Sequence, residues 1–198
     1  MRFDLEIIAS WIEPGARVLD LGCGSGDLLY FLVQNKEVRG TGIDFEEANI
    51  VHCIERGISV IQGDINEEVL DYADNTFDYV ILSRTLQQVY EPEALLKELL
   101  RVGRRIVVSF PNFSHWLCRM QLFFMGRTPT TSQLPYEWYN TPNIRVITLR
   151  DFRGFVQKTG FKIIRETGIN TQNEDLHGRV IRLLPNLRAT YGIFLIGH

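Results

Sequence analysis

The sequence of 198 residues has few cysteines, and their spacing excludes two kinds of cross-linked domain. Cys23, Cys53 and Cys118 are odd in number, lie far apart and form no CxxC pair. Neither a disulfide framework nor a zinc site fits this spacing, whereas a reducing cytoplasm does. The four histidines are isolated and show no HxxxH spacing. We therefore expect a cytoplasmic protein without a metal site.

Long apolar runs and an excess of basic residues are also missing. The start, MRFDLEIIASWIEP, carries Asp4 and Glu6 inside its apolar run, which is unlike a signal peptide. No stretch is long enough to span a bilayer. The 21 basic and 24 acidic residues give a net charge of -3, which offers no general attraction to phosphate backbones. We expect no membrane partner and no nucleic-acid partner.

The composition is that of an ordinary globular protein. Hydrophobic residues make up 45% and charged residues 23% of the chain, which is enough apolar material for a core. The length suits one domain. We predict a single domain over residues 1–198, with a helix and a loop inserted at about residues 112–147.

Strands and helices alternate over the first 110 residues. A first helix has Leu5, Ile8 and Ile12 on its apolar face, with Asp4 placed elsewhere. This rhythm predicts βαβ units and a parallel sheet. The predicted strands are 17–21, 38–43, 59–62, 77–82 and 105–110, and the predicted later helices are 27–33, 47–56 and 91–102.

The last third of the chain has a different pattern. One helical face carries Phe113, Trp116, Leu117, Met120 and Phe124, and we interpret it as core packing. The prolines and turn formers that follow predict a loop over 126–142. The spacing from Thr148 to Asp151 fits a capping box, which opens a helix that closes at Gly160. Strands follow at 161–166 and 190–196, and we interpret Arg179, Arg182 and Arg188 as solvated.

A glycine-rich turn follows the first predicted strand. Ligands of open parallel sheets bind beyond the carboxyl ends of the strands, and glycine lets the backbone approach them closely. Gly22, Gly24 and Gly26 have the spacing GxGxG, which differs from the GxGxxG of dinucleotide enzymes. Asp20 lies two residues before the turn, where it would repel a pyrophosphate and favour an ammonium group.

Two further acids end the second and third strands. Asp44 can accept hydrogen bonds from a ribose diol, and Asp64, with Ile65 beside it, can bind and cover an adenine. A ligand with an ammonium, a ribose, an adenine and no phosphate is S-adenosylmethionine (AdoMet). In the alternative interpretation, Asp44 and Asp64 cap the next helix and turn, and Asp20 bonds the backbone of the loop.

Four pieces in order resemble the class I AdoMet-dependent methyltransferases: VLDLGCGSG, GID at Asp44, GDI at Asp64, and FDYVILS. The resemblance implies an α/β fold with a Rossmann-like, doubly wound sheet of seven strands, mostly parallel with an antiparallel last strand. We add Phe45, which follows Asp44, and Ser83, which ends the fourth strand, to the residues expected at the AdoMet site.

A longer set of motifs resembles the MetW family of methionine biosynthesis. These are DNTFDYVILSRTLQQVYEP, VVSFPNFSHW and LPYEWYNTPNIRVITLRDF. The resemblance implies a methyltransferase-like protein that binds AdoMet or S-adenosylhomocysteine (SAH) and acts with homoserine O-acyltransferase. The segment from Phe113 to Ile144 would then dock the acyltransferase.

The sequence leaves methyl transfer open, and the catalytic residues unassigned. The loop after the fourth strand has no NPPY-like motif and no histidine, and Gln87 and Gln88 cannot take a proton. The alternative is a class I methyltransferase acting on an unknown small molecule, and an NAD-dependent enzyme fits the glycine spacing poorly. The distant candidates for a catalytic group are Tyr90, His115, Tyr136 and Tyr139.

Overall fold

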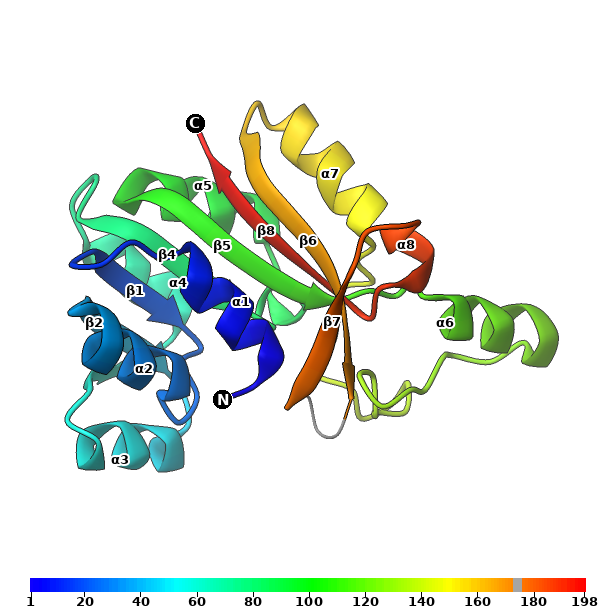
Figure 1. Ribbon diagram of the computed structural model, residues 1–198, viewed down its shortest axis with the longest axis horizontal. Helices are drawn as coiled ribbons and strands as arrows, with labels where there is room; N and C mark the ends of the chain where they lie inside the picture. The colour runs from blue at the N-terminus through cyan, green and yellow to red at the C-terminus, as the bar shows by residue number, and fades with distance from the viewer. Residues whose placement is uncertain (173–175) are drawn as a thin grey trace.

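The computed structural model describes residues 1–172 and 176–198, which form an eight-stranded sheet with helices on both faces (Figure 1). The strand order is β3-β2-β1-β4-β5-β8-β6-β7. The strands are β1 (Arg17–Leu21), β2 (Arg39–Asp44), β3 (Ser59–Gln62), β4 (Phe77–Ser83), β5 (Gly103–Pro111), β6 (Lys162–Gln172), β7 (His177–Ile181) and β8 (Tyr191–Gly197). The helices are α1 (Phe3–Trp11), α2 (Asp27–Lys36), α3 (Glu47–Glu55), α4 (Ile65–Glu68), α5 (Pro92–Val102), α6 (Trp116–Met120), α7 (Leu149–Lys158) and α8 (Pro185–Arg188), with short turns η1 (Val69–Asp71), η2 (Leu86–Gln88) and η3 (Gln121–Met125).

The first five strands are parallel, as the sequence predicted. Their carboxyl ends therefore meet at one edge of the sheet. Along the sheet the chain order reverses between β1 and β4, which is where ligands bind in open α/β folds. The glycine turn after β1 and the loop after β4 both lie at this position.

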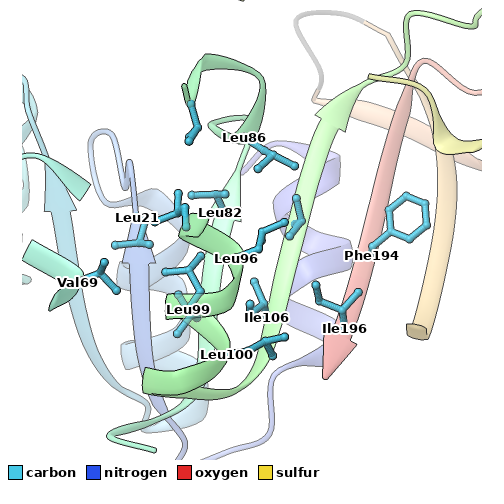
Figure 2. Close-up of a cluster of buried hydrophobic side chains, with 14 of the residues drawn as sticks. Leu21, Val69, Leu82, Leu86, Leu96, Leu99, Leu100, Ile106, Phe194 and Ile196 are labelled. Atoms are coloured by element: carbon cyan, nitrogen blue, oxygen red, sulfur yellow. The ribbon is translucent and has the colours of Figure 1, made fainter. Parts of the chain in front are cut away.

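Each face of the sheet buries its own apolar cluster. On one face, Leu82 of β4 packs with Leu96 and Leu99 of α5 (Figure 2). On the opposite face, Tyr79 and Ile81 of β4 pack with α1 and α2. Alternate side chains of a strand point to opposite faces, so an apolar run such as β4 requires a layer of helices on each side. Among the described residues, no helix is long and apolar enough to cross a membrane.

The prediction of seven strands was wrong by one strand. β6 continues beyond its predicted end at Glu166 to Gln172 and pairs with β7 in an antiparallel hairpin. β7 (HGRVI) lies at the sheet edge and is mostly exposed, so it lacks the alternating apolar pattern that identifies a half-buried strand. The last strand of the chain, β8, is antiparallel to β5, as the sequence predicted.

The aromatic stripe was wrongly interpreted as core. α6 and η3 extend away from the sheet, with no other layer of the fold over them (Figure 1). The side chains of Trp116, Leu117, Met120 and Phe124 are exposed, and Phe113 is half-buried. The helical spacing is real, but the face that it creates does not contact the core.

The helix after this segment begins as predicted. Thr148 is the N-cap of α7, and its Oγ accepts a hydrogen bond from the backbone N–H of Asp151 at 3.1 Å. The Asp151 carboxylate in turn accepts from the Thr148 hydroxyl at 2.7 Å. This cap fixes the point at which the chain returns from the projecting segment to the sheet.

Candidate functional site

Two adjoining clefts lie at the carboxyl edge of the sheet. The larger has a volume of about 540 Å³ and the smaller about 110 Å³, and Gly22 and Ser83 line both. The larger cleft is also lined by Asp44, Phe45, Asp64 and Ile65, and the smaller by Asp20 and Gly24. Eight of the nine residues expected at the site therefore come together, whereas Gly26 lines neither cleft.

Asp20 is the most unusual group at this edge. Its side chain is buried, and among the described residues its Oδ1 has no hydrogen-bond partner. Burial raises the pKa of Asp20 to about 7, an effect that Arg2 opposes and Asp44 reinforces. A buried carboxylate oxygen without a donor is costly, so this position fits a ligand that brings a cationic donor.

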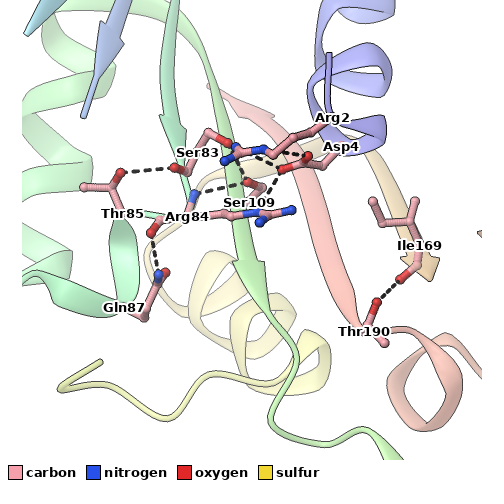
Figure 3. A network of polar contacts seen from close by, with 9 residues as sticks. All are labelled: Arg2, Asp4, Ser83, Arg84, Thr85, Gln87, Ser109, Ile169 and Thr190. Carbon is pink, nitrogen blue, oxygen red and sulfur yellow. Dashed lines mark hydrogen bonds and ion pairs between the residues drawn. The ribbon is translucent and has the colours of Figure 1, made fainter. Parts of the chain in front are cut away.

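An ionic network that the sequence reasoning missed borders the smaller cleft (Figure 3). Asp4 is fully buried and accepts from Arg2 at 3.2 Å and from Arg84 at 2.9 Å. The prediction that Asp4 lies off the buried face of the first helix was wrong. Asp4 precedes the buried Ile8 by one turn, and an acid at that spacing is a signal that could have found it.

Arg84 follows β4 directly and connects three parts of the fold. Its backbone has a φ of 59°, which is uncommon for a residue other than glycine. Its N–H donates to the Ser109 carbonyl at 2.9 Å, and its guanidinium stacks 4.1 Å from the Tyr191 ring centroid. Strained residues concentrate at binding and catalytic sites, and Arg84 lines the larger cleft.

The three glycines of the turn have different roles. All three have positive φ, which favours glycine. A Cβ on Gly22 would lie 2.7 Å from the Thr85 hydroxyl, and one on Gly26 would lie 2.9 Å from the Cys53 thiol. A Cβ on Gly24 would meet nothing within 4 Å, so Gly24 is the position that keeps open space beside the smaller cleft.

The thiol in the turn is a packing group. Burial raises the pKa of the Cys23 thiol well above its usual range. A Cβ on Gly42 of β2 would lie 2.6 Å from the Cys23 sulfur, so the thiol packs closely on this strand. Cys23 therefore has the properties of an inert filler and not of a nucleophile.

Asp44 holds the turn in place. Its carboxylate accepts from the Gly24 N–H at 2.7 Å, the Glu46 N–H at 3.0 Å and the Asn49 amide at 3.0 Å. A carboxylate has about four acceptor positions, so roughly one remains for a ribose hydroxyl. Two hydrogen bonds from a ribose diol to Asp44 were expected. They would require one of the three present donors to share its acceptor position with a ribose hydroxyl.

The far end of the larger cleft is lined by polar and apolar groups side by side. Asp64 is the N-cap of α4, and its Oδ1 accepts from the Asn66 N–H at 2.8 Å and the Asn66 amide at 2.7 Å. Ile65 is half-buried beside it, and Phe45 is 74% exposed at the rim. An exposed ring and an aliphatic side chain in one cleft suit a planar base.

The loop after β4 provides few groups for proton transfer. Gln87 is buried and its amide donates to the Arg84 carbonyl, so it is a structural residue. Tyr90 lines the larger cleft, whereas His115, Tyr136 and Tyr139 line neither cleft. Burial lowers the pKa of His115, which keeps it neutral. Among the described residues, no group of three or more histidine, cysteine or acidic side chains could hold a metal ion.

The donors and acceptors of the two clefts fit the cofactor expected from the sequence. Asp20 offers a buried anionic acceptor, Asp44 a remaining acceptor position, and Asp64 a carboxylate beside Ile65. Gly24 leaves room for the backbone to approach. AdoMet, when bound, would bring an ammonium group, hydroxyls, an amine and a transferable methyl group.

Comparison with known protein families decides the relationship. The profile described as "Methionine biosynthesis protein MetW" matches residues 2–196. The chain belongs to the MetW family. Within the family it is similar to the "Bifunctional methionine biosynthesis protein MetXA/MetW" of Rhodopirellula baltica, with 37% identity over 175 residues. The match covers 84% of this chain but only 28% of that relative.

Solved structures share the fold of this MetW-family chain. A SAM-dependent methyltransferase from Archaeoglobus fulgidus has a TM-score of 0.69 and 17% identity, covering 98% of this chain and 91% of that one. M. capricolum TrmK, solved in complex with SAH, has a TM-score of 0.61 and 13% identity, covering 100% of this chain and 68% of that one. These likenesses establish a Rossmann-like methyltransferase fold.

Proposed function

We propose that this MetW-family chain binds AdoMet or SAH and acts in methionine biosynthesis together with a homoserine O-acyltransferase. The observation that carries the ligand is Asp20, whose buried Oδ1 has no donor among the described residues. An ammonium group would supply that donor and favour the ionised form of Asp20.

The two clefts would hold different ends of one ligand. The smaller cleft, with Asp20, would take the amino-acid end, and the larger cleft would take the nucleoside. Asp44 would accept from the ribose, while Asp64, Ile65 and Phe45 would contact the adenine. SAH in the structure of M. capricolum TrmK supports this choice of ligand.

The partner is supported by a fused relative. The name of the Rhodopirellula baltica protein joins MetXA and MetW, and this chain matches 28% of its length. Two activities in one polypeptide are held at a high effective concentration, which favours their association. We infer that this chain associates with a homoserine O-acyltransferase.

Calorimetry with AdoMet and SAH tests the ligand, and a pull-down with purified homoserine O-acyltransferase tests the partner. We expect saturable binding of both compounds at one site, and association with the acyltransferase in the absence or presence of AdoMet. If neither compound binds, the proposed ligand is wrong. If the two proteins do not associate at any AdoMet concentration, the proposed partner is wrong.

Methyl transfer to a small molecule is a second candidate function. It is favoured by Tyr90, a residue with a phenolic hydroxyl that lines the larger cleft and is 78% exposed. Labelled-methyl transfer from AdoMet into a bacterial extract would distinguish the two functions. Turnover without the acyltransferase would favour this second function, and transfer lost in a Tyr90→Phe variant would assign the hydroxyl.

A further inference from the structure

The projecting segment, residues 112–147, concentrates exposed apolar side chains. Among the described residues, twelve of twenty-four exposed large hydrophobic residues lie in this segment. Single exposed apolar residues are ordinary, but a contiguous group of them marks an interaction surface. The twelve are Trp116, Leu117, Met120, Leu122, Phe123, Phe124, Met125, Tyr136, Trp138, Tyr139, Ile144 and Val146.

The arm formed by α6 and η3 projects away from the sheet (Figure 1). Side-chain exposure is greatest near the end of this arm. Phe123 is 81% exposed and Phe124 67% exposed, and their rings pack edge to face with centroids 4.9 Å apart. Leu122 and Met125 flank them and are also exposed. A helical turn that is apolar on all sides is normally buried, so this one lacks its cover.

The charge of the arm favours a protein partner over a lipid surface. Between Asn112 and Tyr136 the charged residues are Arg119 and Arg127. The Arg119 guanidinium is held by the backbone and side chain of Ser114, at 2.8 Å from the carbonyl. Segments that bind anionic membranes carry clusters of several basic residues, which this arm does not. Its occupant should be an apolar groove of a protein.

The arm is hydrogen-bonded to the return chain, residues 126–147, which leads from the arm back to the sheet. The side-chain amide of Gln121 donates to the Thr130 carbonyl at 2.8 Å and accepts from the Thr130 N–H at 2.9 Å. Leu134, further along the return chain, is buried. A displacement of the arm would therefore also move Thr130 and the residues that lead back to the sheet.

The return chain is fastened to the loop that lines the ligand cleft. The N–H groups of Ile144 and Arg145 both donate to the Gln87 carbonyl at 3.0 Å. The Arg145 guanidinium donates to the carbonyls of Val89, at 3.3 Å, and Tyr90. Val89 and Tyr90 line the larger cleft, so one short loop contacts both the ligand site and the projecting segment.

We propose that the arm docks the homoserine O-acyltransferase and that residues 86–90 couple docking to occupancy of the ligand clefts. The inference rests on the proposed function, which supplies the partner and the ligand. Coupling between two sites is reciprocal, so AdoMet changes the affinity for the acyltransferase by the same factor as the acyltransferase changes the affinity for AdoMet.

The test uses the full chain, the purified acyltransferase and SAH as the probe ligand. The docking variant is the double substitution Phe123→Ser and Phe124→Ser, and its control is Ile54→Ser, another exposed apolar residue, on α3. The coupling variant is Arg145→Ala. Calorimetry measures SAH binding with and without saturating acyltransferase, and acyltransferase binding with and without SAH.

We expect the double variant to bind SAH as the wild type does and to bind the acyltransferase at least about thirtyfold more weakly, the loss typical of interface anchors. Ile54→Ser should match the wild type. In the wild type, each ligand should change the affinity for the other by roughly 5–150-fold, whereas in Arg145→Ala this factor should approach one.

Each other outcome overturns a defined part of the proposal. A coupling factor of one in the wild type, or an unchanged factor in Arg145→Ala, would overturn coupling through residues 86–90. Equal acyltransferase binding by wild type and double variant would overturn the docking surface. SAH binding without any acyltransferase binding would overturn the proposed partner, and the reverse would overturn the proposed ligand. Self-association that the double variant abolishes, or binding to phosphatidylglycerol vesicles, would assign the arm to a second copy or to a membrane.

Discussion

At the scale of single residues, Asp20 is a buried carboxylate whose Oδ1 has no hydrogen-bond donor among the described residues. Asp20 is buried, and its pKa is raised to about 7 because burial disfavours its charge. A cationic ligand group would stabilise the ionised form and so displace a proton at neutral pH. Asp20 thus links ligand affinity, stability and pH in ways that can be measured.

SAH affinity should rise with pH. Because the ligand ammonium prefers ionised Asp20, binding should strengthen as the pH rises through about 7 and level off above about pH 8. Below about pH 6 affinity should fall by about tenfold per pH unit. Calorimetry across this range checks the dependence. A flat profile in the wild type would contradict the assignment of Asp20 to the ammonium.

Asp20→Asn should weaken SAH binding but stabilise the ligand-free chain. The raised pKa means that the stability contributed by Asp20 is present below its unfolded value of 3.8 and is lost as the pH rises through about 7. At pH 8 the variant should therefore gain about 1–3 kcal/mol, the cost of an unsatisfied buried group. Denaturant unfolding at pH 8 and pH 5 measures this gain, which should shrink at the lower pH.

The matched control for that variant is Asp64→Asn, whose carboxylate is exposed. It should leave stability at pH 8 close to that of the wild type, because asparagine caps a helix about as well as aspartate and keeps an oxygen that can accept from the Asn66 N–H. A less stable Asp20→Asn variant at pH 8 would show that the wild-type carboxylate has a partner in the ligand-free chain.

Asp44→Ala should weaken SAH binding by about tenfold to a few hundredfold, since a bond to a charged group contributes roughly 1.5–3 kcal/mol. The substitution also removes the acceptor of the Gly24 N–H, so part of the loss comes from a loosened turn. Asp44→Asn, which keeps one oxygen acceptor, should lose less. Unchanged affinity in Asp44→Ala would remove this residue from the site.

At the scale of elements, the glycine turn has a backbone conformation that disfavours other residues, and it lines the smaller cleft. Gly24→Ala and Gly57→Ala should both cost about 1–2 kcal/mol of stability, because each has a positive φ and a Cβ would meet nothing within 4 Å. Of these two glycines, Gly24 lines the smaller cleft, whereas Gly57 lines neither cleft. Gly24→Ala should therefore weaken SAH binding by about tenfold or more in calorimetry, with Gly57→Ala unchanged. Equal affinities in the two variants would show that the ligand does not approach this turn.

The elements differ in how well the sequence predicts them. β1 to β5 were predicted because each is a short apolar run between turn signals, with helices of clear period between them. β7 was missed because an exposed edge strand needs no apolar alternation. The arm of α6 and η3 has a true helical period, but periodicity cannot tell a face that contacts the core from one that awaits a partner.

The site was predicted to the extent that motifs sit at strand ends. Asp20, Asp44 and Asp64 line adjoining clefts as expected because the parallel sheet brings its carboxyl ends to one edge, and their binding of a ligand stays a prediction. The network of Arg2, Asp4 and Arg84 was missed because its Asp4–Arg84 pair joins α1 to the loop after β4. An ion pair between residues so far apart in the chain leaves no local pattern in a single sequence.

At the scale of the whole molecule, the sheet order places the two clefts between β1 and β4 and the arm beyond β5. The loop at residues 86–90 connects them, because it lines the larger cleft and holds Ile144 and Arg145. A rigid sheet with one shared loop suits a protein whose ligand and partner influence each other. The ion pairs of the buried Asp4 with Arg2 and Arg84 stabilise the same edge.

A crystal structure of the chain grown with SAH tests the central claim most directly. The account predicts one SAH molecule that occupies both clefts, with its amino group within hydrogen-bond distance of Asp20 and a ribose hydroxyl on Asp44. Its adenine should lie between Ile65 and Phe45. SAH bound away from the glycine turn, or crystals without SAH at saturating concentration, would contradict the account.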